Sequence, residues 1–344
     1  MTDSKVAPKL NIEKTVQDIL NVIDRERERE IISRRYGLFD RKETLEQIGE
    51  LLGITRERVR QLEKSVIAKL KDLAATDLPN IDQVKDIFEQ EIKDLGHVAR
   101  ISELTAKLTD EANKIDQARV SFLAQLVPTL AFVDESDHYH MSAGIAETHS
   151  EKAFRDQVGY VIEGIKKIGA PAKIEEIAGA LGHPDASRTK ALASVSKHLA
   201  TLNGRYGLAK WPMVNPKNIR DKIYVILHEN GKQMHFNEIA KSIRDSGFKR
   251  KEVTTQAIHN ELIKDGRFVL VGRGIYALKE WGYKKGTVSD VITEVLKEAK
   301  QPLHRDEIVK RVLKKRFVKE TTILLNLQGK PEFKRVAKAT YDLA

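Results

Sequence analysis

The apolar residues that follow Thr55 recur at three- and four-residue steps, which is the spacing of one face of an α-helix. They are Val59, Leu62, Val66 and Leu70. Thr55 stands just before this pattern, where a side-chain oxygen can accept a hydrogen bond from the first backbone N–H groups of a helix. The sequence therefore predicts a helix that begins after Thr55 and packs its apolar side against a core.

A shorter helix is predicted directly upstream. Thr44 and Gln47 have the spacing of a capping box, in which each side chain bonds to the other residue's backbone N–H. The apolar face of this helix consists of Ile48, Leu51 and Leu52. Gly53 supplies the turn to the longer helix. Two short helices joined in this way form a helix-turn-helix, whose second helix can enter the major groove of DNA.

The side of the second helix opposite its apolar face is polar. With about 100° between successive residues, the side chains that project there are Glu57, Arg60, Gln61 and Lys64, flanked by Arg56. Arg can bond to guanine, Gln to adenine and Glu to cytosine, while Arg and Lys can also hold phosphates. The alternative is a solvated helix face with ion pairs, and the pattern by itself leaves both interpretations open.

Three motifs follow one another in this part of the chain. They are "RYGL" (35–38), "TLEQIG" (44–49) and "TRERVRQLE" (55–63). In this order and at this spacing the segment, roughly residues 12–75, resembles region four of the primary-type bacterial sigma factors. The resemblance covers about a fifth of the chain. It implies a helix-turn-helix domain that reads promoter DNA and associates with RNA polymerase.

The resemblance also implies roles for individual residues. Base contacts in the upstream promoter hexamer, the minus thirty-five element, fall to Arg56, Glu57 and Gln61. Contacts with the DNA backbone fall to Thr55, Arg58, Arg60 and Lys64. Contacts with the beta flap of the RNA polymerase core fall to Ile31, Ile32, Tyr36 and Leu38, with core packing as the alternative for at least two of them. Only about 25 residues precede the similar segment, without an aromatic cluster, so we expect no promoter melting by this chain alone.

The rest of the chain contains a fourfold repeat. The repeated pieces read "RISELTAKL" (100–108), "KIEEIAGAL" (173–181), "HFNEIAKSI" (235–243) and "HRDEIVKRV" (304–312). Each is flanked by predicted helices and followed by alternating apolar residues around turn signals, which predicts a β-hairpin. The predicted fold is mainly α: a helix-turn-helix domain followed by an array of three to four winged helices, each of three helices plus a β-hairpin. The predicted divisions are a tail (1–11), the helix-turn-helix (12–75) and winged-helix-like domains at 80–145, 150–215, 217–283 and 285–344, with linkers at 76–80, 143–151, 212–218 and 283–286.

The third copy carries a second resemblance. Its "DGRF" (265–268) precedes a hairpin and "YALKEW" (276–281), and "YGLAKW" (206–211) repeats the Tyr-x-Leu-x-x-Trp pattern. In this order residues 217–283 resemble the HARE-HTH winged helix, a family that includes the N-terminal domain of the RNA polymerase delta subunit. Tyr341 belongs to a truncated copy of the pattern and Tyr139 to a weaker one. We expect the aromatic residues of the two full copies, Tyr206, Trp211, Tyr276 and Trp281, to close the hairpin over the helices rather than to stack on bases.

Charge divides the chain unevenly. Residues 217–344 contain 28 Lys and Arg against 16 Asp and Glu, a net charge of +12, whereas residues 76–150 have a net charge of −8. The basic part suggests a polyanion as partner and the acidic part a protein, with solvated helix faces as the alternative. We do not expect the acidic copy to bind DNA. Candidate phosphate contacts in the basic part are Lys249, Arg250, Lys251, Lys314, Lys315 and Arg316.

These patterns favour a bacterial, sequence-specific transcription factor that binds double-stranded DNA and the RNA polymerase core. The alternatives are a delta-like polymerase-associated protein and a DNA-targeting subunit of a restriction or modification system. We expect no enzymatic activity, cofactor or metal, because no phosphate loop, dinucleotide motif or HExxH occurs; His138 and His140 fit a hairpin strand better, and His235 and His304 a helix start. The absence of Cys and of a signal peptide predicts a cytoplasmic, nucleoid-associated protein, not a membrane protein. The oligomeric state stays open.

Overall fold

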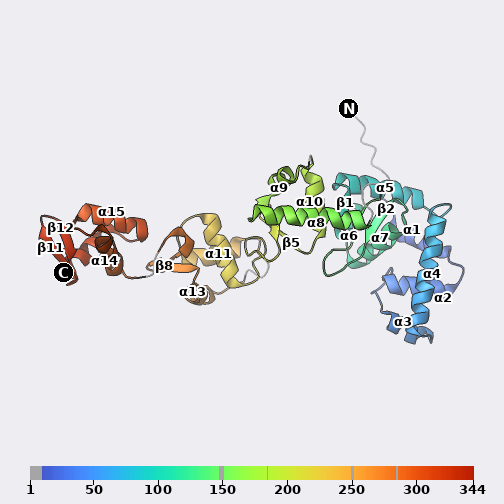
Figure 1. Ribbon diagram of the computed structural model, residues 1–344. Helices are drawn as coiled ribbons and strands as arrows, with labels where there is room; N and C mark the ends of the chain where they lie inside the picture. The colour runs from blue at the N-terminus through green and yellow to red at the C-terminus, as the bar shows by residue number, and fades with distance from the viewer. Residues whose placement is uncertain (1–9, 147–150, 184, 249–251, 284–285) are drawn as a thin grey trace, which may run out of the picture. The chain divides into compact units, whose positions relative to one another are not determined.

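The computed structural model describes residues 10–146, 151–183, 185–248, 252–283 and 286–344. The chain forms two compact units, Met1–Lys210 (unit 1) and Trp211–Ala344 (unit 2), each with its own core (Figure 1). Among the described residues, no helix is long and apolar enough to cross a membrane.

Unit 1 begins with four helices, which are α1 (Ile12–Asn21), α2 (Glu26–Tyr36), α3 (Leu45–Leu52) and α4 (Arg56–Ala74). The predicted caps are confirmed: Thr44 and Gln47 form a capping box at α3, and the Thr55 side chain accepts a hydrogen bond from the backbone of Arg58 at the start of α4. Gly53 links the two helices in a left-handed conformation with φ of 64°. The predicted helix-turn-helix is therefore present.

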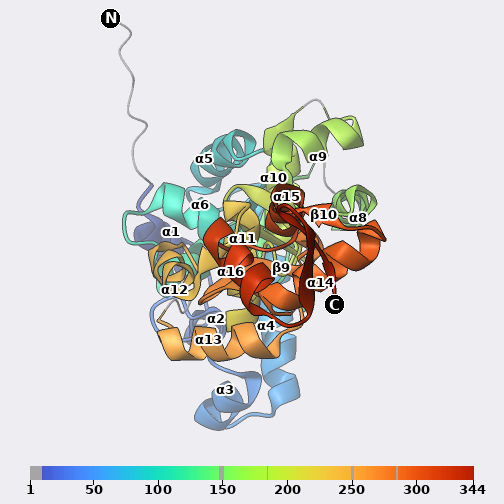
Figure 2. The same cartoon turned by 90° about the vertical axis from the view of Figure 1, so that its left-hand side faces the viewer.

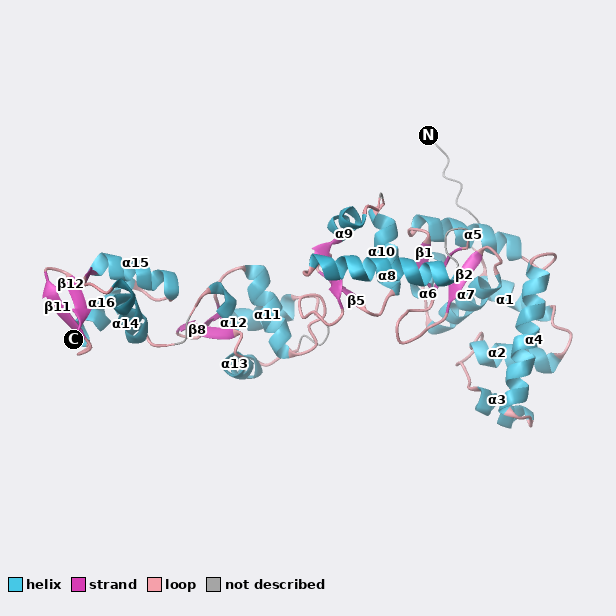
Figure 3. Cartoon of the chain, in the orientation of Figure 1, coloured by secondary structure: helices cyan, strands magenta, loops and turns pink. Residues whose placement is uncertain are grey.

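Four copies of one order of elements follow: a helix, a short strand, two helices and two strands (Figure 3). The first two copies belong to unit 1. The first has α5 (Ile81–Asp94), β1 (Val98–Arg100), α6 (Ile101–Leu108), α7 (Lys114–Leu126), β2 (Leu130–Val133) and β3 (Ser142–Ile145). The second has α8 (Glu151–Ile168), β4 (Ala172–Lys173), α9 (Ile174–Leu181), α10 (Ala186–Val195), β5 (Leu199–Leu202) and β6 (Arg205–Leu208).

Unit 2 holds the other two copies. The third has α11 (Ile219–Asn230), β7 (Met234–His235), α12 (Phe236–Asp245), α13 (Thr255–Lys264), β8 (Phe268–Gly272) and β9 (Ile275–Leu278), followed by a 3₁₀ turn, Lys279–Trp281. The fourth has α14 (Val288–Ala299), β10 (Leu303–His304), α15 (Arg305–Lys315), α16 (Glu320–Gly329), β11 (Phe333–Ala337) and β12 (Thr340–Leu343).

Every copy builds the same small antiparallel sheet, in which the last strand lies between the other two, as in β7-β9-β8. The second helix of each copy is held by one fully buried residue of the repeat: Leu104, Ile177, Ile239 or Ile308. His235 and His304 cap the second helices of their copies, as predicted, because their ring nitrogens accept backbone hydrogen bonds. Tyr276 and Tyr341 are buried against the helices, which agrees with closure of the hairpin.

Two expectations for the first copy are wrong. Residues 143–145 belong to β3 rather than to a linker, because their backbone pairs with both β1 and β2. Tyr139 is not part of that hairpin; it forms an isolated bridge with Ser196 of the second copy. The loop that carries His138 and His140 thus leaves its own sheet and binds the neighbouring copy through backbone hydrogen bonds, His140 N to Val195 O (2.9 Å) and Lys197 N to His138 O (2.9 Å).

The helix-turn-helix region and the first copy share one hydrophobic core, which runs from Leu10 to Ile145. Helix α7 makes the connection. Tyr36 packs edge-on against Phe122 with ring centroids 5.2 Å apart, and its hydroxyl donates a hydrogen bond to Gln125 Oε1 (2.8 Å). Arg119 Nε donates to the backbone carbonyl of Leu38 (2.8 Å). A second, smaller core between α2, α3 and α4 is formed by Ile31, Ile48 and Val59.

Candidate nucleic-acid interface

Helix α4 presents a continuous exposed polar face. Both views place its first turns beside α3, at the end of unit 1 furthest from α5 (Figures 1 and 2). Val59, on the opposite side, is fully buried and fixes the rotation of the helix. The sequence-predicted contact residues on this face are all exposed: Thr55, Arg56, Glu57, Arg58, Arg60, Gln61 and Lys64. The helix therefore offers this face to a partner without any rearrangement of its core.

The polar side chains on this face bond to one another in the free protein. Glu57 accepts two hydrogen bonds from Arg60, at 2.9 and 2.6 Å, and Arg58 donates to Gln61 Oε1 at 3.4 Å. Arg56 forms an ion pair with Glu46 of α3 at 3.3 Å. Hydrogen bonds from Arg60 lower the pKa of the Glu57 carboxyl, which keeps it ionised at neutral pH. Exposed pairs of this kind are weak, so DNA can replace them at little cost.

The position of α4 relative to α3 depends on a close backbone contact. A Cβ atom at Gly49 would lie 2.7 Å from the carbonyl oxygen of Ile54, so a side chain there would push the turn away from α3. The backbone N–H of Ile54 in turn donates to Gly49 O at 2.9 Å. The glycine thus allows the tight approach that sets the angle at which α4 leaves the turn.

The residues expected to contact the polymerase flap are occupied by the protein's own packing. Ile31, Ile32 and Leu38 have no exposed surface, and Tyr36 lies against α7, where burial raises its pKa. Ile32, Leu38 and Tyr36 pack in the core that α7 shares with the region 4 segment, and Ile31 packs in the second core between α2, α3 and α4. Core packing, the alternative interpretation, therefore describes Ile31, Ile32 and Leu38, whereas Tyr36 is half-buried, and the flap contact itself stays a prediction.

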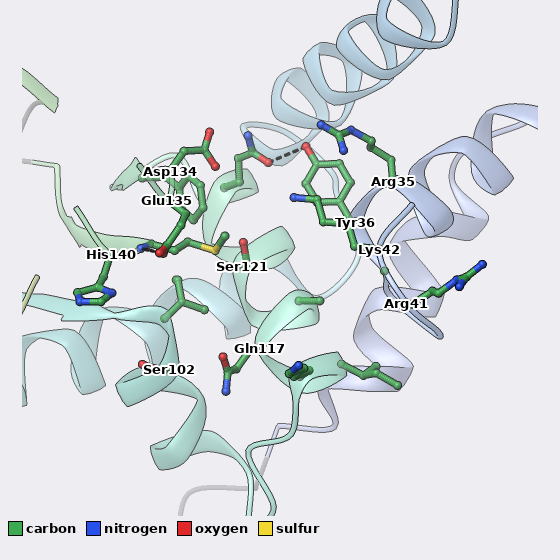
Figure 4. A pocket seen from close by; sticks show the side chains of 18 of the residues that line it. Arg35, Tyr36, Arg41, Lys42, Ser102, Gln117, Ser121, Asp134, Glu135 and His140 are labelled. Carbon is green, nitrogen blue, oxygen red and sulfur yellow. Dashed lines mark hydrogen bonds between the residues drawn. The ribbon is translucent and has the colours of Figure 1, made fainter. Parts of the chain in front are cut away.

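A cavity of about 640 Å³ lies between this region and the first copy (Figure 4). Arg41 and Lys42 lie on one side of it and Asp134 and Glu135 on the other side (Figure 4), and Lys114 also lines it. Tyr36, Ser121 and Gln125 contribute polar atoms between the two walls. Glu135 already forms an ion pair with Lys197 at 2.5 Å, so part of the acidic wall serves to hold the second copy.

The basic candidates of the C-terminal part have different environments. Lys249, Arg250 and Lys251 lie outside the described residues. Lys315 is bound to Glu298 at 2.7 Å and to Glu294 at 3.4 Å, and Arg316 donates to the carbonyl of Gly286 and is partly buried, which lowers its pKa. Lys314 alone of the described three is exposed. Lys315 and Arg316 therefore hold helices and loops together, and their use as free phosphate contacts is not supported.

Two residues that the sequence analysis missed take part in this arrangement. Glu46 orients Arg56, and Arg119 ties α7 to Leu38 and forms an ion pair with Glu13 at 3.2 Å. Glu46 lies inside the "TLEQIG" motif, so its place in the first turn of α3 was a usable signal. Arg119 gave no such signal, because its partners are distant in the sequence.

Comparison with known proteins identifies the first part of the chain. The family model described as sigma-70, region 4 matches residues 25–72, which include α2, α3 and most of α4. Residues 25–72 form a sigma-70 region 4 domain. This region 4 domain contains every predicted DNA-contacting residue of α4, whereas α1 lies before the match. The expected sigma-factor, helix-turn-helix and DNA-binding character of this part of the chain is thereby confirmed.

Curated relatives resemble the chain over a similar length. RNA polymerase sigma factor SigA of Microcystis aeruginosa is 47% identical over 58 residues, which are 16% of this chain and 14% of the relative. Sigma factor sigB of Arabidopsis thaliana is 48% identical over 59 residues, 16% of this chain and 10% of the relative. SigA of Listeria monocytogenes is 34% identical over 79 residues, which are 23% of this chain and 20% of the relative. The chain thus spans a fifth or less of the length of these relatives.

In the part of the chain that the structure describes, no group of three or more His, Asp or Glu residues could hold a metal ion. The closest imidazole pair, His138 and His198, stacks with ring centroids 5.0 Å apart and shares a hydrogen bond of 2.8 Å. This pair belongs to the contact between the first and second copies.

Proposed function

We propose that this protein is a DNA-binding transcription regulator whose region 4 domain reads promoter DNA with α4. The observation that carries the proposal is the exposed polar face of α4, set by the capped helix-turn-helix. Arg56, Glu57 and Gln61 contact base edges of a promoter element, as the minus thirty-five hexamer is contacted in the family that the segment resembles. Thr55, Arg58, Arg60 and Lys64 contact phosphates and set the register.

The other proposed partner is the RNA polymerase core, in keeping with the sigma factors among the relatives. A contact with the beta flap through Tyr36 and Leu38 would require α7 to separate from the region 4 domain. We therefore propose that polymerase contacts use exposed residues, and that this chain neither melts promoter DNA alone nor catalyses a reaction. Run-off transcription with purified core polymerase and no other sigma factor checks whether the chain can melt promoter DNA alone, because robust transcripts would contradict the proposal that it does not.

We further propose that the four helix-and-sheet copies are winged helices and that the third is of the HARE-HTH type. What supports this is the order of three helices and a hairpin, together with the structural use of "DGRF". Arg267 bonds to Asp265 at 2.7 Å and to Asp221 of α11 at 3.2 Å, and it packs over the rings of Tyr224 and Phe268. The basic unit 2 adds contacts to DNA phosphates, while the acidic first copy binds protein, here the region 4 domain itself.

The test of base reading is selection from a randomised duplex library with the full chain. Arg56→Ala and Gln61→Ala should each relax preference at one base pair, with a loss of about 1–3 kcal/mol per bidentate contact. Lys69→Ala is the matched control, since Lys69 is exposed on the same helix about 12 Å further along. If Arg56→Ala and Gln61→Ala both leave the base preference unchanged, α4 does not read bases.

A further inference from the structure

The hairpin of the fourth copy differs from the other three hairpins in its burial. After Phe333, every residue of β11 is exposed, so both faces of this strand are in solvent. The corresponding strand of the third copy, β8, buries three of its five residues. Strand β11 is therefore held by its pairing with β12 and by Phe333, and its remaining side chains are not needed for the core.

The exposed side chains of this hairpin are mostly cationic. Lys334 and Arg335 lie on β11 and Lys338 lies in the turn; we call them the hairpin cations. The ion pairs of the fourth copy involve other residues, such as Arg311 with Glu307 and Lys315 with Glu298. Arg335 Nε donates to the carbonyl of Ala337 at 3.2 Å, and Asp342 faces Lys334 in the register of the strands. The cluster keeps a net positive charge.

The third helix of the fourth copy has the opposite character. In a helix-turn-helix the helix in this position usually enters the DNA groove. Here α16 (sequence ETTILLNLQG) contains no Lys or Arg between its caps, Lys319 and Lys330, and its Leu325 side chain is 68% exposed. A helix whose only charged residue is Glu320, in its first turn, is poorly suited to approach a polyanion with its face. Of the third helix and the hairpin of this copy, it is therefore the hairpin that carries exposed Lys and Arg side chains.

A charged edge strand can also serve to prevent sheets from pairing edge to edge. That explanation would apply equally to the matching edge strands β2, β5 and β8. Their sequences are LAFV, LATL and FVLVG, and none contains a charged residue. Because only one of four equivalent edges carries cations, edge protection does not account for the pattern.

We propose that the hairpin cations bind the backbone of duplex DNA, and that α16 does not take part. The inference rests on the proposed DNA contact of unit 2 and assigns it to one element. Duplex DNA fits better than duplex RNA, because the major groove of B-DNA admits a β-ribbon whereas that of A-form RNA is too narrow. Exposed Val336 between the cations can meet a thymine methyl group. Contact through phosphates makes the binding largely independent of sequence.

The test compares two triple variants of the full chain that lose the same charge. One is K334Q/R335Q/K338Q in the hairpin. The control is K297Q/K300Q/K310Q, in which three exposed Lys of α14, its C-cap and α15 are changed. Fluorescence anisotropy with a random DNA duplex across a salt series gives the affinity and its slope against log salt. The hairpin variant should bind about tenfold more weakly and lose roughly 0.9 from the slope for each phosphate contact removed.

The control variant should lose clearly less affinity and less of the salt slope than the hairpin variant does. R335K should bind as the wild type does. Equal losses in the two triple variants would overturn the proposal, and so would a loss confined to duplex RNA. The variant T321A/Q328A on α16 should leave DNA affinity unchanged. A tenfold loss of affinity in this variant would show that α16 contacts DNA and would contradict the proposal. Failure of base reading by Arg56 and Gln61 in the selection experiment is a separate result and does not alter these outcomes.

Discussion

At the scale of single residues, Arg267 connects several parts of the third copy. Its guanidinium joins the loop before β8 to the first turn of α11 through Asp265 and Asp221. It also covers the rings of Tyr224 and Phe268, with its central carbon 5.3 and 5.6 Å from their centroids. A planar, five-donor side chain can make these contacts together, and a Lys cannot.

We expect Arg267→Ala to destabilise unit 2, because it removes the ion pairs with Asp265 and Asp221. The loss should be only about 1–2 kcal/mol, because these ion pairs are partly exposed and solvent weakens them. Arg267→Lys should recover less than half of that. Hydrogen bonds from Arg267 lower the pKa of Asp265 below its ordinary value of 3.8. The stabilisation is therefore fully present above pH 3.8 and disappears as the pH falls through the lower, folded-state pKa.

Urea unfolding followed by Trp fluorescence measures this effect, since both Trp residues, Trp211 and Trp281, belong to unit 2. The difference between wild type and Arg267→Ala should be constant near neutral pH and should shrink below pH 3.8. A difference that stays the same in acid would mean that the Asp265 pair is not its source.

At the scale of elements, the junction of α3 and α4 depends on two glycines with different functions, Gly49 within α3 and Gly53 in the turn. Gly49 has no room for a Cβ atom, whereas Gly53 has φ of 64° and open space around the position of a Cβ. Glycine is required at position 49 by packing and at position 53 by the backbone conformation. A substitution that tolerates a left-handed backbone should therefore be accepted at one position only.

We predict that Gly53→Asn costs less than about 1 kcal/mol, since Asn adopts left-handed conformations readily. Gly49→Ala should cost about 1–3 kcal/mol, because the turn must move away from α3. It should also weaken DNA binding, since the angle of α4 changes. Chemical unfolding monitored by far-UV circular dichroism and a DNA titration check both; equal effects of the two substitutions would contradict this account.

Local elements of this kind could be predicted from the sequence. The caps at Thr44 and Thr55, and the second-helix anchors of the repeat, depend on residues within a few positions of one another. The burial of Tyr36 could not be predicted, because its partners Phe122 and Gln125 are more than 80 residues away. Nor could the bridge between Tyr139 and Ser196, for which alternating residues wrongly suggested a hairpin strand. Long-range pairing leaves no periodic pattern in the sequence.

At the scale of the whole molecule, the shared core makes the region 4 domain part of unit 1 rather than an independent module. Phe122 is fully buried in that core, next to Tyr36 of the region 4 domain. Unit 2 has cores of its own, so the two units should respond separately to a core mutation.

We predict that Phe122→Ala destabilises unit 1 by about 3–5 kcal/mol, the usual range for a Phe removed from a core. The far-UV circular dichroism transition of unit 1 should move to lower urea, while the Trp fluorescence transition of unit 2 stays in place. Phe39→Ala is the control, because Phe39 is 40% exposed and contributes mainly a cation–π contact with Arg119. If both signals moved together, the units would be unfolding as one.

The packing of α7 against the region 4 domain also has a consequence for the order of events during synthesis. The ribosome releases α4 some fifty residues before it releases the end of α7, a delay of roughly 3–10 s at bacterial elongation rates. Through that interval the apolar side chains of α1 and α2 lack their partner and are open to chaperones or to other nascent chains. The second half of α4, which packs in the shared core, is therefore fully held only after α7 has been made, whereas its first turns pack against α2 and α3 without α7.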